Sequence, residues 1–299
     1  MGFLFLLSLS GCQQTPSGDR VPTTYIGGIQ INESSYEKWA KALKDSGMNT
    51  AQVTAYAKHG QWNSDHLWSD LIDTFHIANE IRALKKEGLQ VVMVLRTSLK
   101  HMYDDNEFKW HGMIFPKGRT AKEEWFKRYG LLVDLWAQVC EREGVEVFAI
   151  ASEMNALLST QPLESLPDKL EYFLDEERQW HHLSRILKYQ SLLEAEDLWE
   201  HGIDKYPDQE SYIRAKIRRQ QAWANEVCHN QDDDPIKTMN AERAYLDSTW
   251  RTIIRSARQH YTGELTLAAN FDNYREISFW DELDFIGINA YFPLREYQR

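Results

Sequence analysis

The sequence predicts an α/β protein built on a parallel sheet, and three observations indicate this fold class. Short apolar segments alternate with amphipathic segments of helical period along most of the chain. Glycines end four of the amphipathic segments, at Gly47, Gly88, Gly144 and Gly263. The segment LQVVMVL at residues 89–95 is apolar almost throughout, which is typical of a parallel strand covered on both faces. Regular alternation of this kind indicates repeated βαβ units.

Six strands and the helices between them are predicted in order along the chain. The predicted strands cover residues 25–31, 49–56, 89–95, 145–150, 265–270 and 285–291. A helix follows each of the first three strands, and another at 240–261 precedes the fifth strand. The helical segments place Trp125, Trp136 and Trp250 on apolar faces, so we expect these three rings in the core.

The alternation is interrupted after the fourth strand by a charged, helical segment from about residue 157 to about residue 239. Three aspartates and a proline at 232–235 predict a loop near its end. We interpret the segment as a helical insertion. It could act only as a cap that packs on the rim of the sheet, or as a lid that shapes a binding cleft, and both interpretations stay open.

Composition narrows the class of protein. The chain has 34 Lys and Arg against 45 Asp and Glu, a net charge of −11, which argues against a nucleic-acid partner. Its 11 tryptophans could stack on sugar rings or could fill the core of a large domain. No His, Cys or carboxylate cluster has metal-ligand spacing, and no glycine-rich dinucleotide motif is present. The sequence therefore predicts neither a metal site nor a cofactor.

The N-terminus predicts a targeting segment. An apolar run over residues 1–9 is too short to span a bilayer and is followed by Ser10, Gly11 and Cys12. This arrangement resembles a bacterial lipoprotein signal, although an ordinary secretory signal with a chance cysteine is the alternative. We expect cleavage after residue 11, lipidation of Cys12, and a tether over 12–24. The protein would then be anchored in the cell envelope, at the inner or outer membrane, facing the periplasm or the exterior.

Glu153 is the candidate catalytic residue. Glu153 directly follows the fourth predicted strand, and active-site residues of parallel barrels sit at the carboxyl ends of strands. A partly buried Glu has a raised pKa that suits a general acid, so we expect this state for Glu153. A solvated loop residue or a helix cap is the alternative.

An ordered set of motifs surrounds Glu153. The segments are WHGMI at 110–114, WFKRY at 125–129, FAIASEM at 148–154, WRTIIR at 250–255, YTGELTLAAN at 261–270, FWD at 279–281 and DFIGINAYFPL at 284–294. Together they resemble glycoside hydrolase family 113 and its close TIM-barrel relatives, the β-mannanase-like enzymes. The resemblance runs from Tyr25 to Leu294 except for the insertion. The YTGELTLAAN motif and the motif from Trp280 to Leu294 are together fairly specific, although each alone is not.

The resemblance implies a (β/α)8 TIM barrel and a retaining glycosidase that acts on a β-linked polysaccharide or oligosaccharide, with a mannan-like glycan as the first choice. It implies that Glu153 is the acid/base and that a second Glu, the nucleophile, ends a seventh strand. No seventh strand is found, and Glu296 follows Tyr291 too closely to end one, so no nucleophile is assigned. Ser152 stands where many relatives carry Asn before the acid/base, and Asn155 lies two places after it.

Further residues near strand ends are candidates for binding the sugar. For each, the alternative is a rim, loop or turn residue with no role in binding. They are Arg96, Trp110, His111, Asn270 and Tyr291, beside Ser152 and Asn155.

The length of the barrel part predicts that it is incomplete. Without the first 24 residues and the insertion, about 190 residues remain, against about 250 for an eight-unit barrel. We therefore expect about six of eight strands, truncation at the C-terminus and a monomer. We also expect residues 20–299 alone to be insoluble or poorly folded, and inactive. The alternative function is a carbohydrate-binding surface lipoprotein of the same fold that has no catalytic activity. A further strand ending in Glu beyond residue 299 would favour the enzyme.

Overall fold

The computed structural model describes residues 24–29, 35–175, 177, 205–207, 209–228 and 234–291. The expected signal peptide and Cys12 lie outside these residues, as do Glu296 and much of the expected insertion. Within the described ranges, no helix combines the length and the apolar character that crossing a membrane requires.

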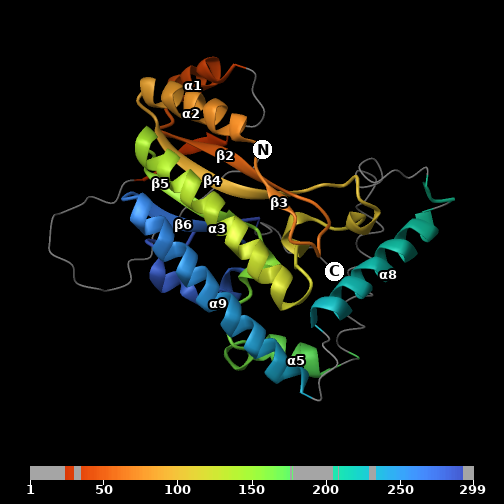
Figure 1. Ribbon diagram of the computed structural model, residues 1–299. Helices are drawn as coiled ribbons and strands as arrows, with labels where there is room; N and C mark the ends of the chain where they lie inside the picture. The colour runs from red at the N-terminus through yellow and green to blue at the C-terminus, as the bar shows by residue number, and fades with distance from the viewer. Residues whose placement is uncertain are drawn as a thin grey trace, which may run out of the picture.

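Six parallel strands form a half-barrel, as the sequence predicts (Figure 1). They are β1 (Gly27–Ile29), β2 (Thr50–His59), β4 (Gln90–Leu99), β5 (Val147–Ser152), β6 (Glu264–Asn270) and β7 (Ile288–Asn289). Their spatial order follows the chain, β1-β2-β4-β5-β6-β7, so the carboxyl ends of all six meet at one edge. A two-residue strand, β3 (Leu67–Trp68), pairs antiparallel with the end of β2 and was not predicted.

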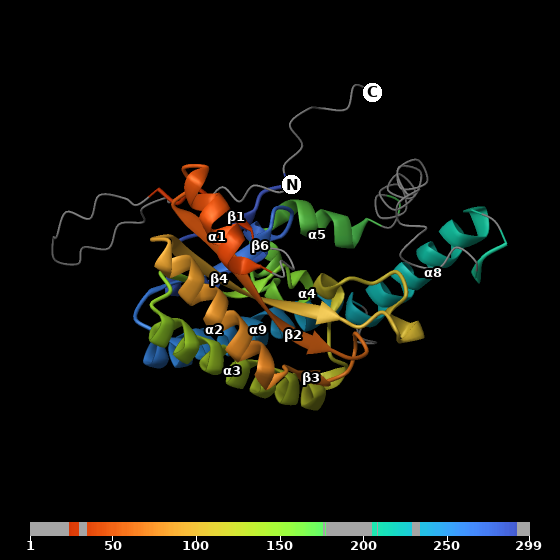
Figure 2. The same ribbon diagram turned by 90° about the horizontal axis from the view of Figure 1, so that it is seen from above.

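Four helices cover the outer side of this sheet, as Figures 1 and 2 agree. They are α1 (Tyr36–Asp45), α2 (Leu71–Lys86), α3 (Gly118–Glu143) and α9 (Pro235–His260). Helix α9 therefore begins five residues before the predicted start. The remaining described α-helices are α4 (Asn155–Leu158), α5 (Pro167–Leu174) and α8 (Gln209–Cys228). Helix α8 lies beyond the end of the sheet to which the arrows of β2 and β4 point (Figure 2).

The main core lies between the sheet and the outer helices. Trp125, Trp136 and Trp250 are fully buried there, which confirms the prediction from helical periodicity. The Trp125 ring stacks on Tyr129, with ring centroids 4.8 Å apart and an interplanar angle of 10°. Strand β4 is buried on both faces, because alternate residues enter the main core and a smaller cluster on the inner face. The inner cluster consists of Val92, Val94, Val147, Ala149 and Ala268.

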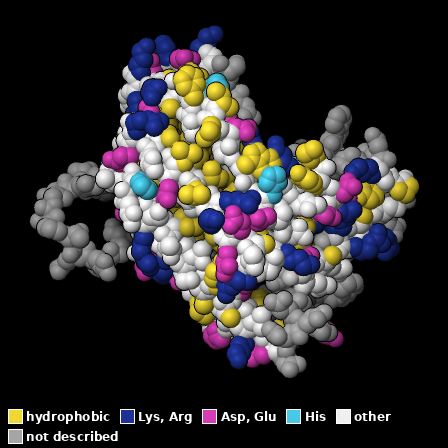
Figure 3. All heavy atoms as spheres, viewed as in Figure 1, with side chains coloured by type: hydrophobic (Ala, Val, Ile, Leu, Met, Phe, Trp, Pro, Cys, Tyr) yellow, Lys and Arg dark blue, Asp and Glu magenta, His cyan; other side chains and the backbone are white. Residues whose placement is uncertain are grey.

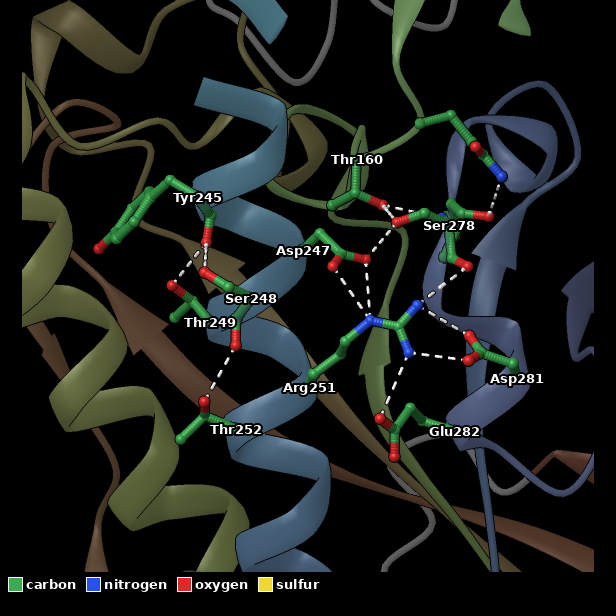
Figure 4. Close-up of polar contacts among 12 residues, drawn as sticks. Thr160, Tyr245, Asp247, Ser248, Thr249, Arg251, Thr252, Ser278, Asp281 and Glu282 are labelled. Atoms are coloured by element: carbon green, nitrogen blue, oxygen red, sulfur yellow. Dashed lines mark hydrogen bonds and ion pairs between the residues drawn. The ribbon is translucent and has the colours of Figure 1, made fainter. Parts of the chain in front are cut away.

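A network of polar contacts ties the segment between β6 and β7 to helix α9 (Figure 4). The Arg251 guanidinium contacts Asp247 on its own helix at 3.0 Å, Asp281 at 2.8 Å and Glu282 at 3.3 Å. The Ser278 amide donates to Thr160 Oγ1 at 2.9 Å, so the same segment also holds the start of the insertion. These bonds fix the short 3-10 helix η6 (Phe279–Glu282), which leads the chain into β7. On the face of the molecule that Figure 3 shows, acidic and basic side chains are interspersed.

His59, at the end of β2, makes the stability of the fold depend on pH. Burial lowers the pKa of its imidazole to about 4. An unfolded histidine titrates near 6.5, so stability is fully present above that pH and falls as the pH drops toward 4. We expect a loss of about 2–3 kcal/mol in the free energy of unfolding between pH 7 and pH 4.5 from this group.

Urea unfolding at the two pH values measures the effect. His59→Leu should remove most of this pH dependence, because the apolar side chain has no proton to exclude. The matched control is His76→Gln, which alters an exposed histidine on α2 and should leave the dependence unchanged. Equal pH dependence in the two variants would contradict the assignment to His59.

Candidate active site

Local irregularity of β5 positions Glu153 at the carboxyl end of the sheet. The register between β5 and β6 shifts between Ala149 and Ser152, as at a β-bulge, which re-aims the side chains that follow. Glu153 then adopts a left-handed backbone with φ of 50°, which is uncommon for a residue other than glycine. Its amide still donates to Ala268 O at 2.9 Å, so the residue stays attached to β6. Strained backbone of this kind concentrates at functional sites.

The Glu153 carboxylate is buried among donors that come from distant parts of the chain. Its side chain is 7% exposed, with Arg96 Nη2 of β4 at 3.5 Å from Oε2 and His111 Nε2 at 3.3 Å from the same oxygen. Asn289 Nδ2 of β7 donates to Oε1 at 2.8 Å. Tyr291 lies close enough that burial together with the charge of Glu153 raises the pKa of its phenol.

These partners overturn the expected pKa of Glu153. Burial is the largest single influence and raises the pKa of the carboxyl. Contacts from His111 and Asn289 and the positive charge of Arg96 together outweigh burial, so the pKa lies below its ordinary value. The expectation of a raised pKa is therefore wrong for the described residues, because it took burial into account without the donors that the fold brings to the site.

Removal of the arginine should move the pKa of Glu153 upward. In Arg96→Met the carboxylate loses a cation 3.5 Å away, so its ionised form becomes less favourable and the pKa rises. Carboxyl-carbon NMR on glutamate-labelled protein can follow the titration, with Glu153→Gln identifying the resonance. The control is Arg82→Met, whose guanidinium pairs with Glu143 outside the site, and it should leave the titration unchanged. An unchanged or lowered pKa in Arg96→Met would contradict this account.

The structure brings four of the predicted residues together, namely Arg96, His111, Glu153 and Tyr291. Trp110 lies next to this group, with its ring edge-on to His111 at 5.0 Å and 37% of the residue exposed.

The other three predicted residues are not among the described contacts of Glu153. Ser152 is buried in β5. Asn270 ends β6, and its Oδ1 accepts from Phe271 N at 2.9 Å, as a turn residue does. Asn155 donates through Nδ2 to Asp272 Oδ1 at 3.2 Å.

Asn289 is the residue that sequence reasoning missed. It stands two residues before Tyr291, and residues two apart on a strand point to the same face. An amide in the otherwise apolar segment FIGINAY was the available signal, and the pairing of that segment with β6 brings it to the same edge as Glu153.

The described contacts of Glu153 are cations and neutral donors, and no carboxylate is among them. Across all the residues that the structure describes, no group of three or more His, Cys, Asp or Glu side chains is arranged to hold a metal ion. The arrangement provides one buried, oriented carboxyl group that can exchange a proton with a bound molecule.

Comparisons with known proteins point to the fold of glycoside hydrolase family 113. The model of Glycoside Hydrolase Family 113 matches residues 237–299. The GH113 β-mannanase AaManA from Alicyclobacillus acidocaldarius, solved in complex with ManMIm, superposes with a TM-score of 0.54 over 91% of this chain, at 15% identity. A GH113 β-1,4-mannanase solved as a complex gives a TM-score of 0.51 over 89% of this chain, also at 15% identity. A search of curated protein sequences found no significant match.

The chain spans 63% and 62% of the lengths of these two structures. Identity at this level shows the fold alone, and the family model covers only the last part of the chain. The half-barrel is therefore folded like the corresponding part of a GH113 β-mannanase barrel.

Proposed function

We propose that this protein is a glycoside hydrolase that acts on a β-linked, mannan-like glycan, with Glu153 as its acid/base. The observation that carries the proposal is the buried Glu153 carboxyl, held by Arg96, His111 and Asn289 at the carboxyl edge of the half-barrel. Two proteins of similar fold are a β-mannanase and a β-1,4-mannanase, which supports the choice of glycan.

In a retaining mechanism, Glu153 first donates its proton to the glycosidic oxygen as the bond to the sugar breaks. A second carboxylate, about 5–5.5 Å from it, forms the covalent glycosyl intermediate. Glu153 then takes a proton from the water that releases the sugar. The proposal needs that second carboxylate from outside the described residues.

The second carboxylate would also favour the protonated form of Glu153. A negative charge nearby raises a carboxyl pKa, which would offset the lowering by Arg96 and His111. This offset shifts Glu153 toward the protonated form that a general acid needs.

The surrounding residues have supporting roles in this proposal. Arg96, His111 and Asn289 orient Glu153, and Tyr291 lies near Glu153 and faces the sugar. Sugar contacts would come from Trp110, Ser152, Asn155 and Asn270. We further propose that the protein is a monomer held at the cell envelope by a lipid on Cys12.

A second candidate function is sugar binding without catalysis. The lowered pKa of Glu153 favours it, because an ionised carboxylate accepts hydrogen bonds from hydroxyl groups but donates no proton. The two candidates predict the same ligand and differ in turnover.

The test uses the protein as its gene encodes it, with β-1,4-mannan, β-1,4-glucan and an α-linked glucan as substrates. We expect reducing ends to appear with β-mannan, and proton NMR of the first product to show retained β-configuration. Binding without any product would leave the second candidate in place of the first. Neither binding nor turnover with any glycan would overturn both.

A further inference from the structure

A long loop brings one of the partners of Glu153 to the candidate site. Residues 100–117 connect β4 to α3 and carry both Trp110 and His111, and we call this segment the His111 loop. Its regular structure consists of two short 3-10 helices, η1 (Asp104–Asn106) and η2 (His111–Met113). Loops of more than about 15 residues with so little secondary structure are uncommon and are usually functional. The position of His111 against Glu153 therefore depends on the segments that hold this loop.

The barrel holds the two ends of the His111 loop. Near its start, Asn106 Nδ2 donates to Gly60 O and Asn106 Oδ1 accepts from Trp62 N, both at 2.8 Å. Near its end, Phe115 N donates to Trp62 O at 2.8 Å. Both anchors lie on the segment after β2, and residues 107–114 form the stretch between them.

Helix α8 of the insertion, which lies beyond the carboxyl end of the sheet, contacts this middle stretch (Figure 2). Arg219 of α8 lies 3.0 Å from the Glu107 carboxylate. One helical turn further on, Trp223 Nε1 donates to Met113 O at 2.8 Å. The insertion is therefore attached to the loop on both sides of His111.

The residues around His111 are packed closely against one another. Met113 N donates to Trp110 O at 2.9 Å, which closes the turn. The Trp110 ring lies so close over Gly112 that a side chain at position 112 would collide with it. The same ring is edge-on to the His111 imidazole. A displacement of the Met113 carbonyl would therefore move Trp110 and His111 with it.

His111 acts on Glu153 across a distance that the loop sets. Its Nε2 lies 3.3 Å from Glu153 Oε2, and 11% of the imidazole side chain is exposed. This contact lowers the pKa of the Glu153 carboxyl, and contacts of this kind weaken steeply when distance or alignment is lost. The other groups that face Glu153 are Arg96, Asn289 and Tyr291. None of these three belongs to the loop, so the loop acts on Glu153 through His111.

We propose that Trp223 is a positioning residue for Glu153, because its bond to the Met113 carbonyl keeps His111 in contact with the carboxylate. This role rests on the proposed function, in which Glu153 is the acid/base. Of the two interpretations of the insertion that the sequence left open, the role extends the cap. The insertion acts on the site by packing on the loop at the rim.

The test introduces Trp223→Phe into the protein as its gene encodes it and follows the pKa of Glu153 by carboxyl-carbon NMR. Phenylalanine keeps an aromatic ring against the loop and removes the indole donor. Both residues are neutral, so the substitution removes no charge and can act only by changing the surroundings of the carboxylate. We expect the pKa of Glu153 to rise, because His111 loses its fixed contact, and to rise less than in His111→Phe. Water entering a merely loosened packing would lower the pKa instead, since it relieves burial.

A double-mutant cycle shows whether Trp223 acts through His111. When Trp223→Phe is combined with His111→Phe, the pKa of Glu153 should equal that of His111→Phe alone, because no imidazole is left to be positioned. Additive shifts would overturn the proposed route. Melting temperatures check that the fold persists, and Trp223→Leu, which also lacks the donor, is a second variant with the same expected rise.

The matched control is Trp39→Phe on α1. Trp39 is partly buried on the outer side of the sheet, and its Nε1 has no acceptor among the described residues, so the pKa of Glu153 should stay unchanged. An unchanged or lowered pKa in both Trp223 variants would overturn the positioning role.

This readout needs no turnover, so it is independent of the proposed hydrolysis. A raised pKa in a protein that hydrolyses no glycan would support the positioning role and overturn the proposed function. An unchanged pKa in a protein that hydrolyses β-mannan would do the reverse.

Discussion

Glu153→Gln is expected to lower kcat/KM for β-mannan by about 10² to 10⁴, the usual contribution of a general acid. Glutamine keeps the size of the side chain but has no proton to give to the glycosidic oxygen. The Asn289 amide can still donate to the new carbonyl oxygen, so the local structure should persist. The assay measures initial rates with the protein as its gene encodes it.

A substrate that needs no proton separates this role from a merely structural one. With an aryl mannoside whose phenol is acidic, the first step should stay fast in Glu153→Gln, and the later attack of water should become limiting. The matched control is Glu80→Gln on α2, where burial raises the carboxyl pKa to about 7 but the helix covers the outer side of the sheet. Equal rate losses with both substrates, or a loss in the control, would contradict an acid/base role for Glu153.

Trp250→Ala is expected to lower the free energy of unfolding by about 3–5 kcal/mol, the range for large aromatic residues removed from a core. The Trp250 ring is fully buried and packs on Phe279 with centroids 6.0 Å apart. Its Nε1 donates to Leu157 O at 2.8 Å, so the variant also leaves a carbonyl unpaired just after the active-site turn. Urea unfolding followed by circular dichroism measures the change.

Trp250→Phe separates these contributions, because it keeps most of the packing and loses only the indole donor. We expect a smaller loss, on the order of 1–3 kcal/mol, from the unpaired carbonyl. Trp68→Ala, at a partly exposed ring on β3, serves as the control and should change stability far less. A loss below about 1 kcal/mol in Trp250→Ala would show that the helix layer repacks around the missing ring.

The sheet and its helix layer could be predicted because their signals are local. Each strand of the half-barrel is a short apolar run, and each outer helix repeats apolar residues at helical spacing, so burial follows from the order of residues alone. The three core tryptophans were placed correctly for the same reason. Two-residue β3 carries no such pattern, since its pairing depends on the turn that follows β2.

The site was predicted in part. Strand ends placed Arg96, Glu153 and Tyr291 at one edge, because neighbouring parallel strands share a direction. The charge state of Glu153 could not follow from local sequence, since its partners come from β4, the loop before α3, and β7. The packing of α8 near the turn after β6, where both line one cavity, likewise follows from no periodicity in the sequence.

Glu153 follows β5 and contacts residues on both sides of that strand. Arg96 lies on the neighbouring strand β4, and Asn289 lies on β7, two strands away on the other side. The two oxygens of one carboxylate thus connect the first and last of four adjacent strands, with Oε2 near Arg96 and Oε1 bonded to Asn289. A change in sheet curvature would alter these two contacts, and the pKa of Glu153 would change with them. A titration of Glu153 would therefore report on the curvature of the half-barrel.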